Sequence, residues 1–454
     1  MTSLTHPRLS GLGCNPMASD DVLVRLAAHG AGRHGVEQRD GLLADVVVEA
    51  LLTHGGSDSG VLMRRSLISP EMRRRIASHS DRAIRDAYAD FIRSMVDLGV
   101  PTHIDALEEA YGEPPRALAG APDPKLRAAV AQTWWERPVE VQVNLLADPD
   151  PQVRAVATAR EEPGVPPEWW DRCLADPATR ANVARRVLLT WEQFLALTRD
   201  GDDEDVRQAV AANPYLTADM VARLLDVDDP VVRIALAHSR PVDERTRDSL
   251  YAHVEGQRAD GSIEAEVALG WNPARPVWLS DAPLAERLTY VDCRHVAFRL
   301  VLAACRDLPQ EAWRRLDDDP DLQVRRTAAR RPDAPPEVLE RLVRAHGDVF
   351  HLSPLLVEHP NFPRHTLRTL ADEPDPHVRY VALQDPELPA PALERLAVAE
   401  ESFVRSGVAR HPNITDTLLE RLLSDPDPEV VHGAAANPAL RPERMHRILT
   451  DAGL

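Results

Sequence analysis

The sequence predicts an all-α protein: a right-handed α-solenoid, or superhelix, built from two-helix repeats of about 24 to 28 residues. Three observations support this prediction. An Asp-Pro-Asp-Pro-x-Val-Arg phrase at 148–154 returns in variant form along the chain, as at 425–430. A further proline follows each phrase, and then a Leu-rich segment. A phrase with a fixed period of this length indicates a repeat array.

The arginine of the phrase sets one register for twelve positions between 127 and 431. Most of these positions are 25 to 28 residues apart, whereas the two intervals that flank Glu266 are 33 residues each. Asn182, Glu266, Ser353 and Val431 are the exceptions to arginine. The remaining eight form the predicted structural ladder: Arg127, Arg154, Arg207, Arg233, Arg299, Arg325, Arg379 and Arg405. An Asp lies about six residues before most of them, so pairing of Arg with Asp within or between repeats is expected.

The elements of one repeat follow in order from the chemistry of its turns. An Asp before Pro favours a helix start, because the Asp side chain caps free N–H groups and Pro suits the first helical position. The next proline ends that short helix. A second, amphipathic helix follows, with apolar residues at helical spacing such as Val338, Leu339 and Leu342. One unit cannot bury its apolar face alone, so neighbouring units are expected to stack.

The strength of the pattern divides the chain into four regions. Residues 1–120 are expected to be divergent N-terminal helical repeats, and 121–238 regular repeats. Residues 239–293 hold the longer, irregular repeats, and 294–454 continue as regular repeats. Insertions in an array usually form loops on one face, often the binding face.

The repeated phrase, the x-Pro turn and the Leu-x-Arg-Leu helix resemble those of the leucine-rich repeat variant family, bacterial relatives of HEAT-type solenoids. The resemblance extends from about Ala121 to the C-terminus. It implies a superhelix in which α-helices alternate with shorter 3₁₀-like helices, and it does not imply an enzyme. Some members carry an iron–sulfur cluster. This chain departs from them, because Cys14, Cys173, Cys293 and Cys305 lie far apart whereas a cluster needs about four converging thiolates. No cofactor or metal is expected.

Composition limits the classes of partner. The net charge of −19 makes the chain a poor default binder of nucleic acid, whose phosphates require basic groups. The longest apolar run, 42–52, is interrupted by acidic residues and too short to span a membrane. The first residues lack a signal-peptide pattern, so a cytoplasmic protein is expected. Lys125 is the only lysine, a bias typical of a GC-rich bacterial genome.

Clustered charges are expected to have mainly structural roles. The Asp residues of each Asp-Pro turn should lie along one edge, where they either cap helices or form a docking edge for a basic partner. The densest basic region, with Arg64, Arg65 and 73–75, is interpreted as a solvated helix face, and the alternative is a contact with phosphate or with an acidic partner.

No motif for a P-loop, a dinucleotide fold, a zinc protease or a serine hydrolase occurs. Tryptophan gives the most useful functional signal. Trp271 and Trp278 lie in the irregular stretch near Glu266, which reverses the charge of the arginine position. Tryptophan is enriched at interface hot spots, so these three residues form the predicted partner contact. The alternative is that the rings fill space between poorly matched repeats.

The sequence therefore predicts a non-enzymatic scaffold that binds another protein of unknown identity. The alternative is a HEAT-type DNA-binding solenoid resembling alkylpurine glycosylases, which would need a basic concave face with an exposed Trp and an Asp. The net charge of −19 argues against that alternative.

Overall fold

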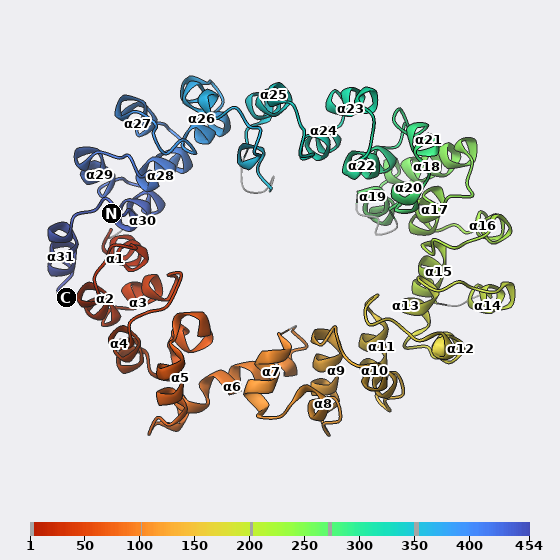
Figure 1. The fold of residues 1–454 in the computed structure, drawn as a ribbon, viewed down its shortest axis with the longest axis horizontal. Helices are drawn as coiled ribbons and strands as arrows, with labels where there is room; N and C mark the ends of the chain where they lie inside the picture. Colours follow the sequence, from red (N-terminus) through yellow and green to blue (C-terminus); the bar gives the residue numbers. More distant parts are fainter. Residues whose placement is uncertain (1–3, 101, 200–202, 271–274, 349–353) are drawn as a thin grey trace. The chain divides into compact units, whose positions relative to one another are not determined.

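The computed structural model describes residues 4–100, 102–199, 203–270, 275–348 and 354–454. Within these ranges helices are the regular elements and no strand occurs, so the predicted all-α solenoid class is confirmed. The chain forms two compact units (Figure 1). We call residues 92–328 the central unit, and residues 1–91 with 329–454 the terminal unit.

The central unit contains a succession of short helix pairs. Its elements are α7 (Ile104–Tyr111), α8 (Pro115–Leu118), α9 (Pro124–Thr133), α10 (Val139–Leu146), α11 (Pro151–Thr158), η4 (Pro167–Trp169), α12 (Trp170–Ala175), α13 (Arg180–Ala184), α14 (Trp191–Leu197), α15 (Glu204–Ala211), α16 (Ala218–Leu224), α17 (Pro230–Ala237), α18 (Glu244–Ala259), α19 (Ile263–Gly270), α20 (Trp278–Asp281), α21 (Leu284–Leu288), α22 (Val296–Ala304), α23 (Gln310–Asp317) and α24 (Leu322–Ala328).

The terminal unit combines both ends of the chain, and α6 (Arg82–Asp97) leads out of its N-terminal part. Its N-terminal elements are α1 (Thr5–Cys14), α2 (Asp20–Ala27), α3 (Gly30–Glu37), α4 (Asp45–Gly55), η1 (Gly56–Asp58), η2 (Gly60–Met63), η3 (Arg65–Leu67) and α5 (Pro70–Ala77). Its C-terminal elements are α25 (Pro336–His346), η6 (Leu356–Glu358), η7 (Arg364–Asp372), α26 (Pro376–Ala382), α27 (Ala390–Leu396), α28 (Ser402–Arg410), α29 (Asp416–Leu422), α30 (Pro428–Ala436) and α31 (Pro442–Asp451).

The helix starts follow the chemistry of the turn residues. Asp150 caps α11 by accepting hydrogen bonds from the backbone N–H groups of Gln152 and Val153, and Pro151 occupies the first turn. Asp229 and Asp427 cap α17 and α30 in the same way. Within the described ranges, three second helices begin after a threonine cap instead: α14 after Thr190, α16 after Thr217 and α29 after Thr415. These caps place both helices of a repeat at positions set by the sequence.

The expected alternation of α-helices with 3₁₀-like helices is mostly wrong for this chain. The second helix of most described repeats is α-helical, as in α10, α16, α27 and α29. Among the described elements, η7 is a long 3₁₀ helix in place of a second α-helix. The second segments carry Leu at helical spacing, which favours the α-helix, and Thr217 and Thr415 in addition cap α16 and α29.

In several repeats, the residue before the second proline bonds to the preceding repeat. The Asn437 side chain donates to the backbone carbonyls of Ala409 and His411 at 2.7 and 3.0 Å. The His411 ring in turn lies 2.8 Å from the carbonyl oxygen of Asp385. We call this series, which also includes His359 and Asn213, the x-Pro ladder. It satisfies carbonyls at the ends of the first helices, which otherwise have no partner within their own helix.

The described core of the central unit contains two large apolar clusters. One extends from Ala131 to Leu250, and the other from Leu279 to Ala328. Among the described residues, Ile234, Val254, Ala265 and Ala268 form a smaller cluster near the irregular stretch. The extra residues of the first 33-residue interval lengthen α18 to 16 residues, rather than forming a loop.

Candidate functional site

The arginine of the repeat register joins two neighbouring repeats. Arg154 on α11 donates through Nη1 to the backbone carbonyls of Asp148 and Pro149 at 2.8 and 3.1 Å. Its Nε and Nη2 donate to the carboxylate of Asp176 in the next repeat at 2.6 and 3.3 Å. One side chain therefore closes the turn before its own helix and holds the turn of the following repeat.

Other members of the predicted ladder make the same link to a carboxylate of the next repeat. These pairs are Arg127–Asp148, Arg299–Asp319, Arg379–Glu401 and Arg405–Asp425. The Asp about six residues before each arginine does not supply this carboxylate. For Arg154, the residue six positions earlier is Asp148. The backbone carbonyl of Asp148 accepts a hydrogen bond from Arg154, whereas its carboxylate accepts from Arg127 and from the N–H of Asp150.

Three ladder positions differ in detail. Arg233 pairs with Asp228 of its own repeat at 2.6 Å. Arg325 donates to the backbone carbonyls of Asp319 and Pro320. Arg207 lies half-buried on α15.

The pairing changes the acidity of the carboxylates. The hydrogen bond from Arg154 holds the pKa of Asp176 below its ordinary value. Burial raises the pKa of Asp148, but the hydrogen bonds from Arg127 and from the Asp150 N–H together hold it below the ordinary value. The first carboxylates of these turns are buried, as in Asp148 and Asp425. Helix capping and arginine pairing therefore account for these buried carboxylates. Other Asp residues of the same turns, such as Asp226, Asp228 and Asp375, are exposed, so the docking edge stays a prediction.

The predicted partner contact is described only in part. Trp271 lies outside the described residues. Glu266 is exposed on α19. The Trp278 ring is half-buried, and its Nε1 donates to the carbonyl of His238 at 2.7 Å. The ring packs edge-on against Tyr290.

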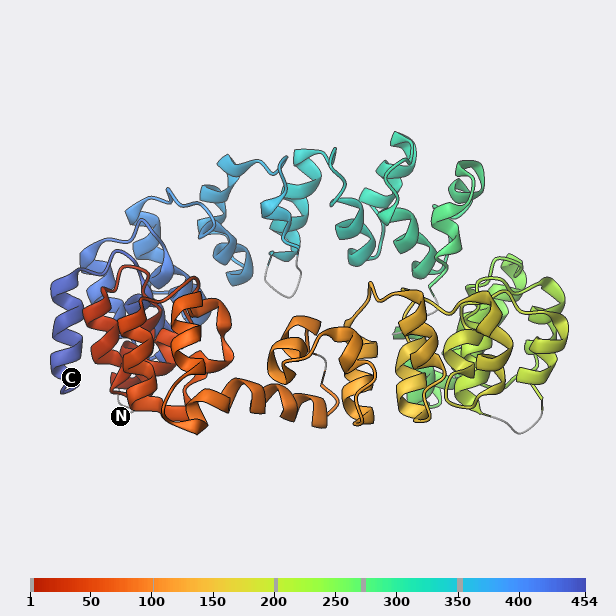
Figure 2. The same ribbon diagram turned by 60° about the horizontal axis from the view of Figure 1, so that its bottom comes forward.

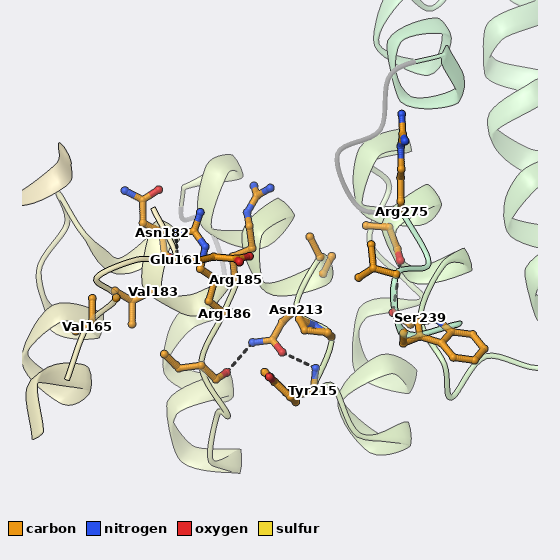
Figure 3. A pocket seen from close by; sticks show the side chains of 18 of the residues that line it. Glu161, Val165, Asn182, Val183, Arg185, Arg186, Asn213, Tyr215, Ser239 and Arg275 are labelled. Atoms are coloured by element: carbon orange, nitrogen blue, oxygen red, sulfur yellow. Dashed lines mark hydrogen bonds between the residues drawn. The ribbon is translucent and has the colours of Figure 1, made fainter. Parts of the chain in front are cut away.

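A cavity of about 600 Å³ lies in the central unit (Figure 3), and the half-buried Trp278 is one of its lining residues. Its walls come from the C-terminal ends of the first helices α11, α15 and α17, from α13 and from residues 275–278. Figure 3 shows Arg185 and Arg186 near Glu161, with Arg275 on the far side of the hollow. The cavity extends along the direction in which the repeats stack, because its walls come from several consecutive repeats.

The lining of this cavity is cationic although the chain carries a net charge of −19. Glu161 is the only carboxylate in the lining, against five arginines: Arg160, Arg185, Arg186, Arg240 and Arg275. Arg240 is compensated by Glu286, at 2.8 Å. In the part of the chain that the structure describes, the guanidinium groups of Arg185 and Arg275 donate to no other residue.

The neighbouring side chains hold the site in shape. Arg186 donates to the backbone carbonyls of Thr158 and Ala159 at 3.0 and 2.8 Å, and burial lowers its pKa. Asn213 of the x-Pro ladder donates to the carbonyls of Ala184 and Val187 beneath the cavity. Three aromatic rings complete the lining: Trp170, Tyr215 and Trp278.

The interpretation of the sequence missed this site, because its arginines are spread from 160 to 275. The position of these arginines within the repeat could have identified the site. Arg160, Arg185, Arg186, Arg240 and Arg275 all fall three to nine residues after their repeat's arginine position, where the first helix ends. The denser basic region near 73–75 behaves differently, since Arg74 and Arg75 form exposed pairs with Glu71 and Glu49.

The cavity offers unpaired cations and aromatic surfaces, which can bind an anionic group. Across the described ranges, no group of three or more His, Cys, Asp or Glu side chains could hold a metal ion. A search of the same ranges finds no helix that is both long and apolar enough to cross a membrane.

Comparison with known proteins supports the repeat identity. The family model described as Leucine rich repeat variant matches residues 322–346, which span α24 and α25. The resemblance to that family is therefore shown in this segment. No curated protein matches the chain.

Solved structures of repeat proteins also match. A leucine-rich repeat variant with a novel repetitive structural motif is 18% identical, with a TM-score of 0.22, covering 64% of this chain and 87% of that one. Karyopherin Kap121p bound to Pho4p is 14% identical, with a TM-score of 0.24, covering 96% and 52%. Kap121p bound to the extreme C-terminus of the phosphatase Cdc14p is 13% identical, with a TM-score of 0.25, covering 95% and 51%. The chain thus spans about half the length of these karyopherin chains.

Proposed function

We propose that this chain is a non-enzymatic repeat scaffold that binds a protein partner, and that it holds an acidic segment of that partner in the cationic cavity. The observation that carries the proposal is the pair of guanidinium groups, Arg185 and Arg275, which donate to no other described residue and line a cavity of a strongly acidic protein. An arginine without a carboxylate partner is available to one supplied by a ligand, and its planar fork suits two-point binding of that group.

The surrounding rings support a protein rather than a simple ion as the ligand. Tyr215 is 55% exposed, and Trp170 and Trp278 present partly covered faces to the same cavity. Tyr, Trp and Arg are the residues most enriched at binding hot spots. Trp278 of the predicted partner contact lines this cavity, and the contact at Trp278, Trp271 and Glu266 remains a prediction.

The glycosylase-like alternative fits less well. That activity would need an Asp beside an exposed Trp on the basic face, whereas the lining of the cavity contains no aspartate. A phosphate-bearing ligand is still recognised by the same guanidinium chemistry. Nucleic acid is therefore included as an outcome of the test.

The test measures binding of a fluorescent peptide that contains four glutamates and one aromatic residue, by anisotropy with the full chain. We expect an Arg185→Glu, Arg275→Glu variant to lose at least tenfold in affinity, because two cations are replaced by anions inside the cavity. Arg306→Glu is the single-charge control on the same unit, since Arg306 is exposed and lies outside the cavity lining. Its effect should be small.

Three results would count against the proposal. The peptide could fail to bind the unmodified chain, or bind the cavity variant equally well. A single-stranded oligonucleotide could also bind tighter than the peptide, with the same dependence on Arg185. That last result would indicate that the cavity binds nucleic acid rather than an acidic protein segment.

A further inference from the structure

The two ends of the chain pack together as consecutive repeats of the terminal unit. Helix α1 packs against α30, as α28 does on the other side of α30, and α2 packs near α31 (Figure 1). Figure 2 shows the same N-terminal helices beside the C-terminal ones from another side. The N-terminal repeat therefore occupies the position that a further repeat would take after α31.

The x-Pro ladder continues across this junction. Asn15, which precedes Pro16, donates through Nδ2 to the backbone carbonyls of Ala435 and Asn437 at 3.0 and 2.7 Å. Asn437 makes the equivalent pair of bonds to the repeat before it, at Ala409 and His411. Asn15 and Asn437 thus occupy the same position of the repeat, and so do the carbonyls that accept their bonds. The junction between the two ends of the chain therefore has the same hydrogen bonds as a junction between consecutive repeats.

Further contacts fix the junction. Arg8 donates through Nε and Nη2 to the carbonyl of Leu423 at 3.0 and 2.9 Å, and Arg25 donates to the carbonyl of Leu454 at 2.8 Å. Gly11 permits the close approach of α1 and α30. A Cβ at that position would lie 2.2 Å from the carbonyl oxygen of His432 and 2.9 Å from the Cβ of Ala435.

Both helices of the junction carry buried apolar residues. Leu9 and Leu12 of α1 are buried, as are Val430, Val431 and Ala434 of α30. Open repeat arrays need terminal repeats with a polar outer face, because an uncovered last repeat exposes its stacking surface. Here the N-terminal and C-terminal repeats cap one another.

We propose that the α30 face is a docking surface for an N-terminal repeat of this same chain, and that a chain whose own N-terminal repeat is displaced accepts that of a second copy. Two different faces meet at this junction, so the contact is of the head-to-tail type. The same two faces can therefore pair within one chain or between two chains through the same contacts.

The test mixes two full-length variants that are blocked on opposite faces. Gly11→Ala blocks the N-terminal face, and Ala435→Phe overfills the buried C-terminal face. Each variant keeps one intact face. We expect monomers from each variant alone and a one-to-one heterodimer in the mixture, measured by size-exclusion chromatography with light scattering and by native mass spectrometry of isotope-labelled chains.

Alkylation of Cys14 reports directly whether the junction is open. Its Sγ lies 3.9 Å from His432 Nε2 at the junction, and burial raises its pKa. We expect at least tenfold faster labelling in Gly11→Ala than in the unmodified chain. Gly30→Ala is the matched control, since a Cβ there meets nothing within 4 Å. A milder Arg8→Ala, Asn15→Ala variant replaces Gly11→Ala if that chain fails to fold.

Each outcome decides one part of the proposal. Unchanged Cys14 labelling in the blocked variants would overturn the mutual capping of the ends. Faster labelling with monomers only in the mixture would overturn the docking of a second copy. A heterodimer that also forms with the Gly30→Ala control would show that the association uses another surface.

Discussion

Arg127→Ala should destabilise the junction between the repeats that contain α9 and α11. The Arg127 guanidinium donates to both oxygens of Asp148, at 2.6 and 2.7 Å, and to the carbonyls of Ala121 and Pro122. The side chains are only 12% and 6% exposed. Without the arginine, the Asp148 carboxylate keeps the Asp150 N–H as its partner.

The size of the effect follows from this geometry. Hydrogen bonds to charged groups contribute about 1.5–3 kcal/mol each, and removal of one partner from a buried ion pair costs about 3–5 kcal/mol. The remaining Asp150 bond moderates the loss, so we expect about 2–4 kcal/mol. The Arg127→Ala, Asp148→Ala double variant should be less destabilised than the sum of the single variants by about 2 kcal/mol.

The assay is native-state hydrogen exchange followed by mass spectrometry of peptides from α9 and α11. It measures the free energy of local opening and does not require the chain to unfold in one step. The Arg116–Glu140 pair also joins two neighbouring repeats, that of α9 and the one before it, but it is 65% and 64% exposed, so the corresponding cycle should show no measurable coupling. Equal coupling in both pairs, or additive effects at Arg127 and Asp148, would refute the reasoning.

Three further predictions follow from individual contacts. Asn213→Ala should leave the carbonyls of Ala184 and Val187 without a donor and cost about 2–3 kcal/mol, read from hydrogen exchange in α13 and α15; protection equal to that of the unmodified chain would contradict it. The pKa of Asp148 is lowered in the folded chain, so the Arg127–Asp148 coupling should be complete at pH 7 and decline below about pH 4, which double-mutant cycles at several pH values would check; coupling that rises in acid would contradict the sign. Burial lowers the pKa of His295 despite its bond to Asp248, so stability should fall as the pH drops below about 6.5, and His295→Gln should reduce that slope in urea unfolding.

The repeat architecture could be predicted because its signals are local and recur in one register. Asp150 followed by Pro151 specifies a capped helix start wherever the phrase occurs, and Asn437 before Pro438 specifies a turn. The residue that pairs with each ladder arginine was harder to predict. Asp148 is near Arg154 in sequence, but its carboxylate faces the preceding repeat, and only the stacking geometry reveals that.

The candidate site could not be predicted, because its residues are far apart in the sequence and meet only in the folded chain. Arg185 and Arg275 are 90 positions apart, and whether either has a carboxylate partner is a property of the folded chain. The pairing of the chain ends was missed for a similar reason. Cys14-Asn15-Pro16 reads as the tail of a repeat, but nothing in the sequence indicates that Asn15 bonds to the repeat at 428–437.

The contacts that bridge the irregular stretch of the central unit have a mechanical consequence. Force applied along a stack of repeats is carried by the contacts between neighbours. In the described part of this unit, Trp278 donates to the carbonyl of His238, and the Tyr251 ring stacks on the His295 ring. These two contacts connect α17 and α18 to the helices that follow the irregular stretch, so they carry part of any load from one large apolar cluster to the other.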